Sequence, residues 1–142
     1  MRTIAAFILI LVCSPAAAEV LTPAEAEARA AAGELTIVDV RLPMEWAETG
    51  LPESGEGVSL QDPATLQIRP DFVDDVLRSV GGQRDRPIAL ICARGNRSAL
   101  ATALLAQAGF TSVHDISEGM IGGTNGPGWL ARRLPTEPCK AC

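Results

Sequence analysis

The sequence contains no tyrosine, only 4% aromatic residues, one histidine and one lysine, Lys140. Its 17 acidic residues outnumber its 12 lysines and arginines, which gives a formal net charge of −5. Nucleic-acid binding depends on basic residues that neutralise phosphates, so this balance argues against a nucleic-acid partner. We attribute the acidity to solubility.

The sequence also lacks an apolar run of about 20 residues, the length that a membrane-spanning helix needs. A shorter run, Ile4–Val12, follows Arg2 and precedes the small residues at 16–18. This pattern is typical of a secretory signal peptide. We expect residues 1–18 to be removed, which leaves a periplasmic or secreted chain with no stable membrane anchor; retention of the segment as an anchor is the alternative.

Cysteine is scarce, and one of the four cysteines lies in the expected signal peptide. Cys139 and Cys142 form a C-x-x-C tail (139–142) after a single domain over residues 19–138. In an oxidising compartment such a pair closes readily, and we favour a local disulfide. The alternative is a redox pair that resolves an intermediate on Cys92, which is left as the odd, reactive thiol.

Alternating elements predict an α/β domain. The capping box at Thr22–Glu25 opens a helix that stops at Gly33. Apolar runs predict strands at 35–40, 88–91 and 113–116, with a short one at 57–60. Helical spacing and glycine or proline boundaries predict further helices at 43–49, 70–80, 97–108 and 129–134.

These elements predict a doubly wound parallel sheet of four to five strands with helices on both faces. In such sheets ligands bind beyond the carboxyl ends of the strands. The chemistry is therefore expected in the segments that follow Val40 and Ile91.

The segment after Ile91 combines a cysteine with a helix start. Cys92 precedes Gly95 and two arginines, and the next helix begins immediately. Free N–H groups and the positive end of the helix favour an anion there, and such surroundings stabilise a thiolate. The interpretation requires Cys92 to be accessible. The predicted loop comprises Cys92, Ala93, Arg94, Gly95, Asn96, Arg97 and Ser98.

This loop resembles the C-x-x-G-x-R-S active loop of the rhodanese, or thiosulfate sulfurtransferase, superfamily. The D-x-R motif of that family is matched by Asp39–Arg41, and Glu45-Trp46 and Gly50 follow it at similar spacing. The segments 104–119 and 129–135 are similar to its C-terminal half. One departure is the absence of a histidine in 50–55, which we interpret as local because that region is not the catalytic centre.

The resemblance implies a rhodanese-like fold and transfer of sulfur through a persulfide on Cys92. The donor would be a small sulfur-containing anion such as thiosulfate, or a persulfide, and the acceptor a thiol or redox protein. Arg94 would meet the sulfonate of thiosulfate, Arg97 would brace the loop, and Ser98 would cap the helix or touch the persulfide. Asp39 and Arg41 would support the loop, whereas Glu45 is expected to be solvated.

Two other functions compete with this one. Cysteine phosphatases carry the motif C-x5-R, with an arginine six residues after the cysteine. Here Ser98 occupies that position and Arg97 lies one residue earlier, so the loop is one residue tighter. A non-enzymatic persulfide carrier or thiol redox partner would use Cys92 with the Cys139/Cys142 pair.

The remaining residues suggest no cofactor and no metal, because two cysteines alone make a poor zinc site. The lone histidine, His114, is expected at a surface or edge position, and Trp46 and Trp129 in packing. The glycine-rich loop from Gly119 to Trp129 either lines the mouth of the site or is a surface insertion.

Overall fold

The computed structural model describes residues 18–140 and residue 142, so the expected signal peptide lies, except for Ala18, outside the described residues. Within the described part of the chain, no helix combines the length and apolar composition needed to cross a membrane.

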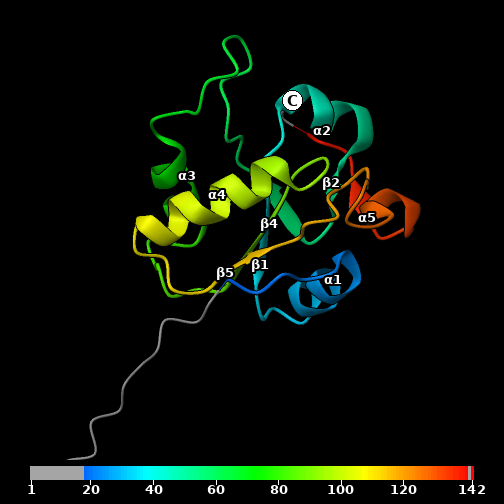
Figure 1. Ribbon diagram of the computed structural model, residues 1–142, viewed down its shortest axis with the longest axis horizontal. Coiled ribbons are helices and arrows are strands. Elements are labelled where there is room, and N and C mark those ends of the chain that lie inside the picture. Colours follow the sequence, from blue (N-terminus) through cyan, green and yellow to red (C-terminus); the bar gives the residue numbers. More distant parts are fainter. Residues whose placement is uncertain (1–17, 141) are drawn as a thin grey trace, which may run out of the picture.

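A four-stranded, fully parallel sheet forms the centre of the fold (Figure 1). In spatial order its strands are β3 (Gly55–Gly57), β1 (Thr36–Asp39), β4 (Ile88–Ile91) and β5 (Val113–Asp115). Asp39 at the end of β1 is in register with Ile91 at the end of β4. The segments that follow these two strands therefore leave the sheet side by side, as the sequence predicts.

Helices cover both faces of this sheet (Figure 1). α3 (Phe72–Ser79) and α4 (Asn96–Gln107) pack on one face, and α1 (Pro23–Ala31) and α5 (Gly128–Ala131) on the other. The remaining helix, α2 (Pro43–Thr49), follows β1. This arrangement confirms the predicted α/β architecture.

The central strands have two buried faces because alternate side chains point to opposite sides of a strand. In β4, Ile88 and Leu90 enter the apolar cluster beneath α3 and α4. Ala89 and Ile91 enter the cluster with α1 and α5. The fully apolar composition of β4 is thus explained by the helices that cover both faces of the sheet.

Several predicted boundaries differ from the structure; α3, for example, begins at Phe72 instead of 70. The short strand lies at Gly55–Gly57 instead of 57–60. The Val58 N–H still donates to the carbonyl of Asp39, the last residue of β1, and the Leu60 N–H donates to the next carbonyl, that of Val40. The last helix ends at Ala131 instead of 134, because Arg133 adopts a left-handed backbone conformation with φ 56°. That conformation does not continue a right-handed helix.

A second, two-stranded sheet was not predicted. β2 (Leu51–Pro52) pairs antiparallel with β6 (Thr136–Glu137). A side chain at Gly50 would come within 2.7 Å of the Glu137 carbonyl oxygen, so the close approach requires glycine there. The pairing fixes the C-terminal tail beside α2.

Candidate active site

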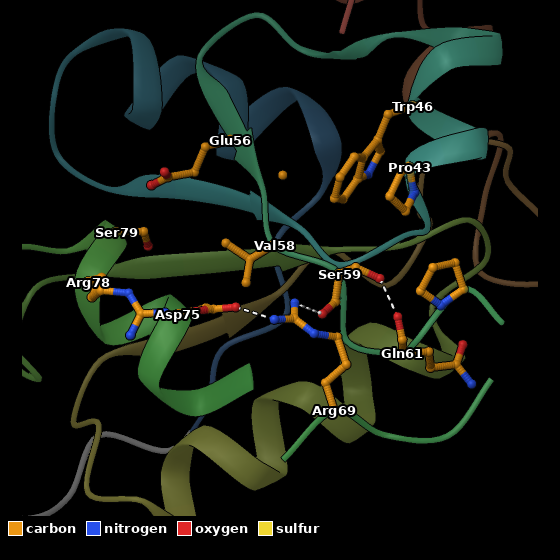
Figure 2. A pocket seen from close by; sticks show the side chains of 12 residues that line it. Pro43, Trp46, Glu56, Val58, Ser59, Gln61, Arg69, Asp75, Arg78 and Ser79 are labelled. Atoms are coloured by element: carbon orange, nitrogen blue, oxygen red, sulfur yellow. Dashed lines mark hydrogen bonds and ion pairs between the residues drawn. The ribbon is translucent and has the colours of Figure 1, made fainter. Parts of the chain in front are cut away.

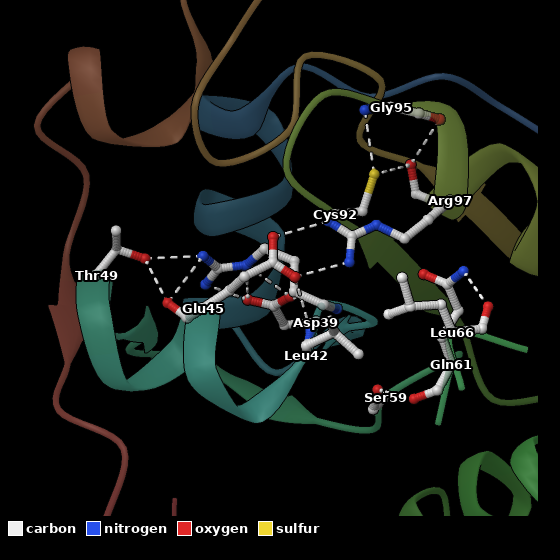
Figure 3. A network of polar contacts seen from close by, with 12 residues as sticks. Asp39, Leu42, Glu45, Thr49, Ser59, Gln61, Leu66, Cys92, Gly95 and Arg97 are labelled. Atoms are coloured by element: carbon white, nitrogen blue, oxygen red, sulfur yellow. Dashed lines mark hydrogen bonds and ion pairs between the residues drawn. The ribbon is translucent and has the colours of Figure 1, made fainter. Parts of the chain in front are cut away.

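Cys92 follows β4 directly and lies at the start of α4. Its Sγ accepts a hydrogen bond from the Gly95 N–H at 3.1 Å (Figure 3). The thiol also lies 3.6 Å from the Ser98 Oγ, which in turn donates to the Gly95 carbonyl at 3.1 Å. Among the described cysteines, it is the free one. The sulfur therefore occupies the electropositive end of a 12-residue helix.

Gly95 makes this loop geometry feasible. It caps α4 with φ 96°, a left-handed conformation that other residues rarely adopt. A Cβ at this position would also lie 2.3 Å from the Ser117 carbonyl oxygen. The backbone can fold tightly around the sulfur only because Gly95 has no side chain.

The thiol is closed off in this structure, since Cys92 is only 1% exposed. Its neighbours differ: Ala93 is half-buried, and Arg94 and Asn96 are exposed. The expectation that the Cys92 thiol is accessible is therefore wrong for this structure, and any reaction at Cys92 requires the loop to open.

Arg97 leaves α4 and pairs with α2. Its Nη1 and Nη2 donate to the two carboxylate oxygens of Glu45 at 2.7 and 2.8 Å. Glu45 also accepts the Leu42 N–H at 2.9 Å and so caps α2. The expectation that Glu45 is solvated is wrong, because the tertiary fold brings α4 against the first turn of α2.

The pKa of the Glu45 carboxyl reflects these contacts. Partial burial alone would raise it, but the Arg97 guanidinium and the Leu42 N–H hold the pKa below its ordinary value. Glu45 is therefore a permanent anion beside the Cys92 loop at neutral pH. The ion pair fixes that loop against α2.

Asp39 and Arg41 form a fully buried pair beneath the loop (both 0% exposed). The Arg41 Nη2 donates to the Asp39 carboxylate at 2.7 Å, and its Nε donates at 3.0 Å. Arg41 also donates to the Thr49 hydroxyl and the Gly50 carbonyl, each at 2.7 Å. Arg41 thus joins the end of β1 to the C-terminal end of α2. Figure 3 shows Asp39, Glu45 and Thr49 in this network.

Arg94 extends to the glycine-rich loop instead of towards the sulfur. Its Nη1 donates to the Gly122 carbonyl at 2.8 Å. The Met120 and Ile121 N–H groups donate to the carbonyls of Cys92 and Ala93 at 2.8 and 2.9 Å. Of the two alternatives for the glycine-rich loop, the structure therefore supports the one that places it at the site.

Glu118 anchors this glycine-rich segment and was missed by the sequence analysis as a supporting residue. It is 6% exposed, and both of its oxygens accept from Arg132, at 2.9 and 2.7 Å. It also accepts the Gly128 N–H at 3.0 Å. The Arg132 hydrogen bonds, with a smaller contribution from the Gly128 N–H, hold the pKa of Glu118 below its ordinary value against burial. The sequence marked Glu118 only as part of a resembling segment.

Comparison with known families decides the identity of this arrangement. The model of the rhodanese-like domain matches residues 22–124, which include both β-strand ends and the whole Cys92 loop. The chain belongs to the rhodanese-like domain family. Sequence resemblance and family comparison thus agree.

The relatives of this rhodanese-like domain include proteins without an assigned function. An uncharacterized protein of Rickettsia prowazekii is 30% identical over 102 residues, which span 70% of this chain and 80% of that protein. A Mycobacterium tuberculosis crystal structure is 26% identical with a TM-score of 0.68, covering 87% of this chain and 98% of that one.

Two further structures share the fold. The polysulfide-sulfur transferase homodimer of Wolinella succinogenes is 24% identical with a TM-score of 0.63, covering 87% of this chain and 81% of that one. A Rhodopseudomonas palustris protein described as a possible tyrosine phosphatase is 27% identical with a TM-score of 0.56, covering 84% and 85%. The fold therefore accompanies more than one suggested chemistry, and the Cys92 loop must decide between them.

The largest hollow described on this rhodanese-like domain does not involve the Cys92 loop. It has a volume of about 600 Å³ and lies between α2, α3 and the segment 56–63 (Figure 2). Arg69 crosses it to reach the Ser59 carbonyl and the Asp75 carboxylate. Of the charged side chains that line the hollow, Arg69, Asp75 and Arg78 are thus engaged with one another.

The tail cysteines are joined in a disulfide, Cys139–Cys142. Its pocket of about 270 Å³ is lined by α2 and β2 residues, and none of the lining residues comes from the Cys92 loop. Cys139 and Cys142 thus lie beside α2 and do not share this pocket with the Cys92 loop.

The other singled-out residues are packed. Trp46 is 8% exposed and Trp129 is fully buried, which confirms their predicted role in packing.

His114 lies in β5, the edge strand of the four-stranded sheet, but is 8% exposed instead of lying at the surface. Burial lowers the pKa of His114, as does the positive charge of Arg29, against the opposing effect of Glu19. Among the described residues, no group of three or more potential metal ligands is found.

Proposed function

We propose that this rhodanese-like domain is a sulfurtransferase that carries sulfane sulfur as a persulfide on Cys92. The donor is thiosulfate or a persulfide, and the acceptor is a thiophile such as a protein thiol. The observation that carries the proposal is the position of a free thiol against the Gly95 N–H at the start of α4. That position suits an anionic sulfur.

The chemistry proceeds in two displacements. The Cys92 thiolate attacks the outer sulfur of thiosulfate, the sulfur–sulfur bond of the donor breaks, and sulfite leaves with the bonding electron pair. The acceptor thiolate then attacks the outer sulfur of the persulfide and releases the Cys92 thiolate. This is covalent catalysis with a modified enzyme as intermediate.

Arg94 is the proposed contact for the donor's anionic end. It is exposed, and its hydrogen bond to the Gly122 carbonyl is one that a sulfonate can replace with a stronger, charge-assisted one. Arg97 is unsuited to this role because both of its terminal nitrogens are held by Glu45. Release of Arg94 from Gly122 also loosens the segment that covers Cys92.

The geometry disfavours a phosphatase. Ser98 occupies the position six residues after Cys92 where C-x5-R phosphatases carry arginine, and Arg97, one residue earlier, is held by the Glu45 carboxylate. The carrier alternative uses the same persulfide but transfers only one equivalent of sulfur to one partner. Turnover number distinguishes a carrier from an enzyme.

The test is mass spectrometry of the protein after treatment with thiosulfate. The tryptic peptide that contains Cys92 should gain about 32 mass units, one sulfur, and Cys92→Ala should show no gain. Cyanide should remove the added sulfur over many cycles. A thiol at position 92 that takes up no sulfur and resists iodoacetamide in the folded protein would refute the proposal, as would faster hydrolysis of a phosphate ester.

A matched pair of variants tests the donor contact. Arg94→Gln should raise KM for thiosulfate about tenfold, the effect of one lost charged contact, with little change in kcat. Arg86→Gln, which alters an exposed arginine before the opposite end of β4, is the control. Equal KM values for the two variants would remove Arg94 from donor binding.

We also propose export of the protein with cleavage after Ala18. The support is the arrangement of Arg2, the apolar run and the small residues before Glu19. N-terminal sequencing of protein from the periplasmic fraction should start at Glu19. Recovery of the uncut chain from the membrane fraction would contradict it.

A further inference from the structure

The C-terminal disulfide lies in a defined structural setting. The β2–β6 pairing holds Glu137 opposite Leu51, two residues before Cys139. The disulfide then lines a pocket of about 270 Å³ whose apolar wall includes Pro43 and Trp46. The pair is therefore held against a preformed hollow.

This pocket adjoins the larger hollow between α2, α3 and the segment 56–63. Pro43, Trp46 and Gly57 line both of them. A Cβ at Gly57 would lie 2.9 Å from the Trp46 ring, so the absence of a side chain at Gly57 leaves room for the indole. Figure 2 shows Trp46 and Pro43 projecting into this space.

The disulfide is not arranged to resolve a persulfide on Cys92. Residues 45 and 46 are neighbours on α2, but Glu45 faces Arg97 of the Cys92 loop, whereas Trp46 faces the tail pocket. In addition, Cys92 is enclosed by its own loop, with contacts from Gly95 and Ser98. The Cys139–Cys142 disulfide and the Cys92 thiol therefore lie in separate environments.

The two sulfurs of the tail differ in accessibility. Cys142 is exposed, whereas Cys139 is half-buried in the pocket. Between them in the sequence stands Lys140, whose ammonium is exposed and lies 3.8 Å from the Glu137 carboxylate. The exposed Cys142 sulfur is therefore the one that an incoming thiolate reaches more easily.

We propose that the Cys139–Cys142 disulfide is a second reactive site, which exchanges with a dithiol on a partner protein, independently of Cys92. A partner thiolate attacks the Cys142 sulfur, the Cys139–Cys142 bond breaks, and Cys139 leaves as a thiolate that takes up a proton. The second partner thiolate attacks the mixed disulfide and releases Cys142. The partner loses two electrons and two protons, and the tail gains them.

The experiment equilibrates the whole mature protein with reduced and oxidised glutathione, followed by acid quench, alkylation and trypsin. Trypsin cuts after Arg133 and Lys140, so the closed pair keeps fragments 134–140 and 141–142 linked, and the open pair releases them. The expected result is a reversible equilibrium in the folded protein. A pair that stays closed in reduced glutathione until the protein is denatured would be purely structural and would overturn the proposal.

Single variants test the order of attack. Cys139→Ser, which leaves Cys142 free, should form a mixed disulfide with oxidised glutathione at least about fivefold faster than Cys142→Ser, because thiol–disulfide exchange depends on access. Equal rates would contradict the assignment of Cys142 as the attacked sulfur.

Two further variants separate this site from Cys92. Cys92→Ala should leave the glutathione equilibrium of the tail unchanged, so failure of the sulfurtransferase proposal does not affect this test. The double variant Cys139→Ser/Cys142→Ser should still acquire sulfur at Cys92 and release it to a small thiol at the wild-type rate. Loss of that release would assign the pair to resolving Cys92 and would refute an independent site.

Discussion

Arg97 and Glu45 stand 52 residues apart in the sequence, and their side chains form a two-point ion pair at 2.7 and 2.8 Å. This pair connects the helix that follows Cys92 to the helix that follows β1. Because the same carboxylate caps α2 through the Leu42 N–H, one side chain determines the position of both segments at the carboxyl edge of the sheet.

Glu45→Gln should weaken this connection. The amide retains an acceptor for Leu42 but loses the charged partner of Arg97, so we expect a loss of about 1–2 kcal/mol in the free energy of unfolding and a lower rate of sulfur uptake at Cys92. Urea unfolding and mass spectrometry measure the two effects. Glu48→Gln alters an exposed carboxylate on the same helix and serves as the control; equal effects of the two substitutions would contradict the prediction.

Gly119→Ala should disturb the Cys92 loop directly. Gly119 has φ 70°, and a Cβ there would lie 2.4 Å from the Ala93 carbonyl oxygen. Gly33→Ala is a matched control, since Gly33 has φ 74° with nothing within 4 Å. Both variants bear the backbone strain, but only Gly119→Ala adds the clash, so it should be less stable than the control by a further ~1–3 kcal/mol. Comparable denaturation midpoints would show that the loop accommodates the methyl group.

Asp39→Asn should be strongly destabilising, by about 3 kcal/mol or more, because it leaves the Arg41 charge buried without its anionic partner. The double variant Asp39→Leu/Arg41→Met removes both charges and should recover part of the lost stability. Thermal or chemical unfolding of the single and double variants measures the difference in their stability. A double variant that is less stable than Asp39→Asn would mean that the other contacts of Arg41 matter more than the charge pair.

The stability contribution of Glu118 should depend on pH. Its pKa is lower in the folded protein than in the unfolded chain, mainly because of the Arg132 hydrogen bonds. The stabilisation is therefore complete above the ordinary carboxyl pKa of about 4.3 and is lost as the pH falls through the lower, folded value. Glu118→Gln should cost stability at pH 7 and progressively less in acid. A stability difference between wild type and variant that is constant from pH 7 to pH 3 would contradict this.

Sequence patterns located most elements of this fold because the patterns reflect local physics. The capping box at Thr22 and Glu25 forms with both expected hydrogen bonds. The apolar run at 88–91 is a strand covered on both faces. The shorter elements were placed less well, because a three-residue strand such as Gly55–Gly57 has no apolar pattern of its own and depends on β1 beside it.

The sequence by itself determined the α/β architecture and the presence of a cysteine at a strand end before a helix, since each follows from periodicity and from residues close together in the chain. The family followed from the resemblance of its motifs. Only the tertiary structure decided that Glu45 pairs with Arg97, that the glycine-rich segment covers the Cys92 loop, that the thiol is enclosed, and that the tail disulfide faces Trp46. These contacts join segments far apart in the chain. Their distances depend on how the helices pack on the sheet, which no local pattern specifies.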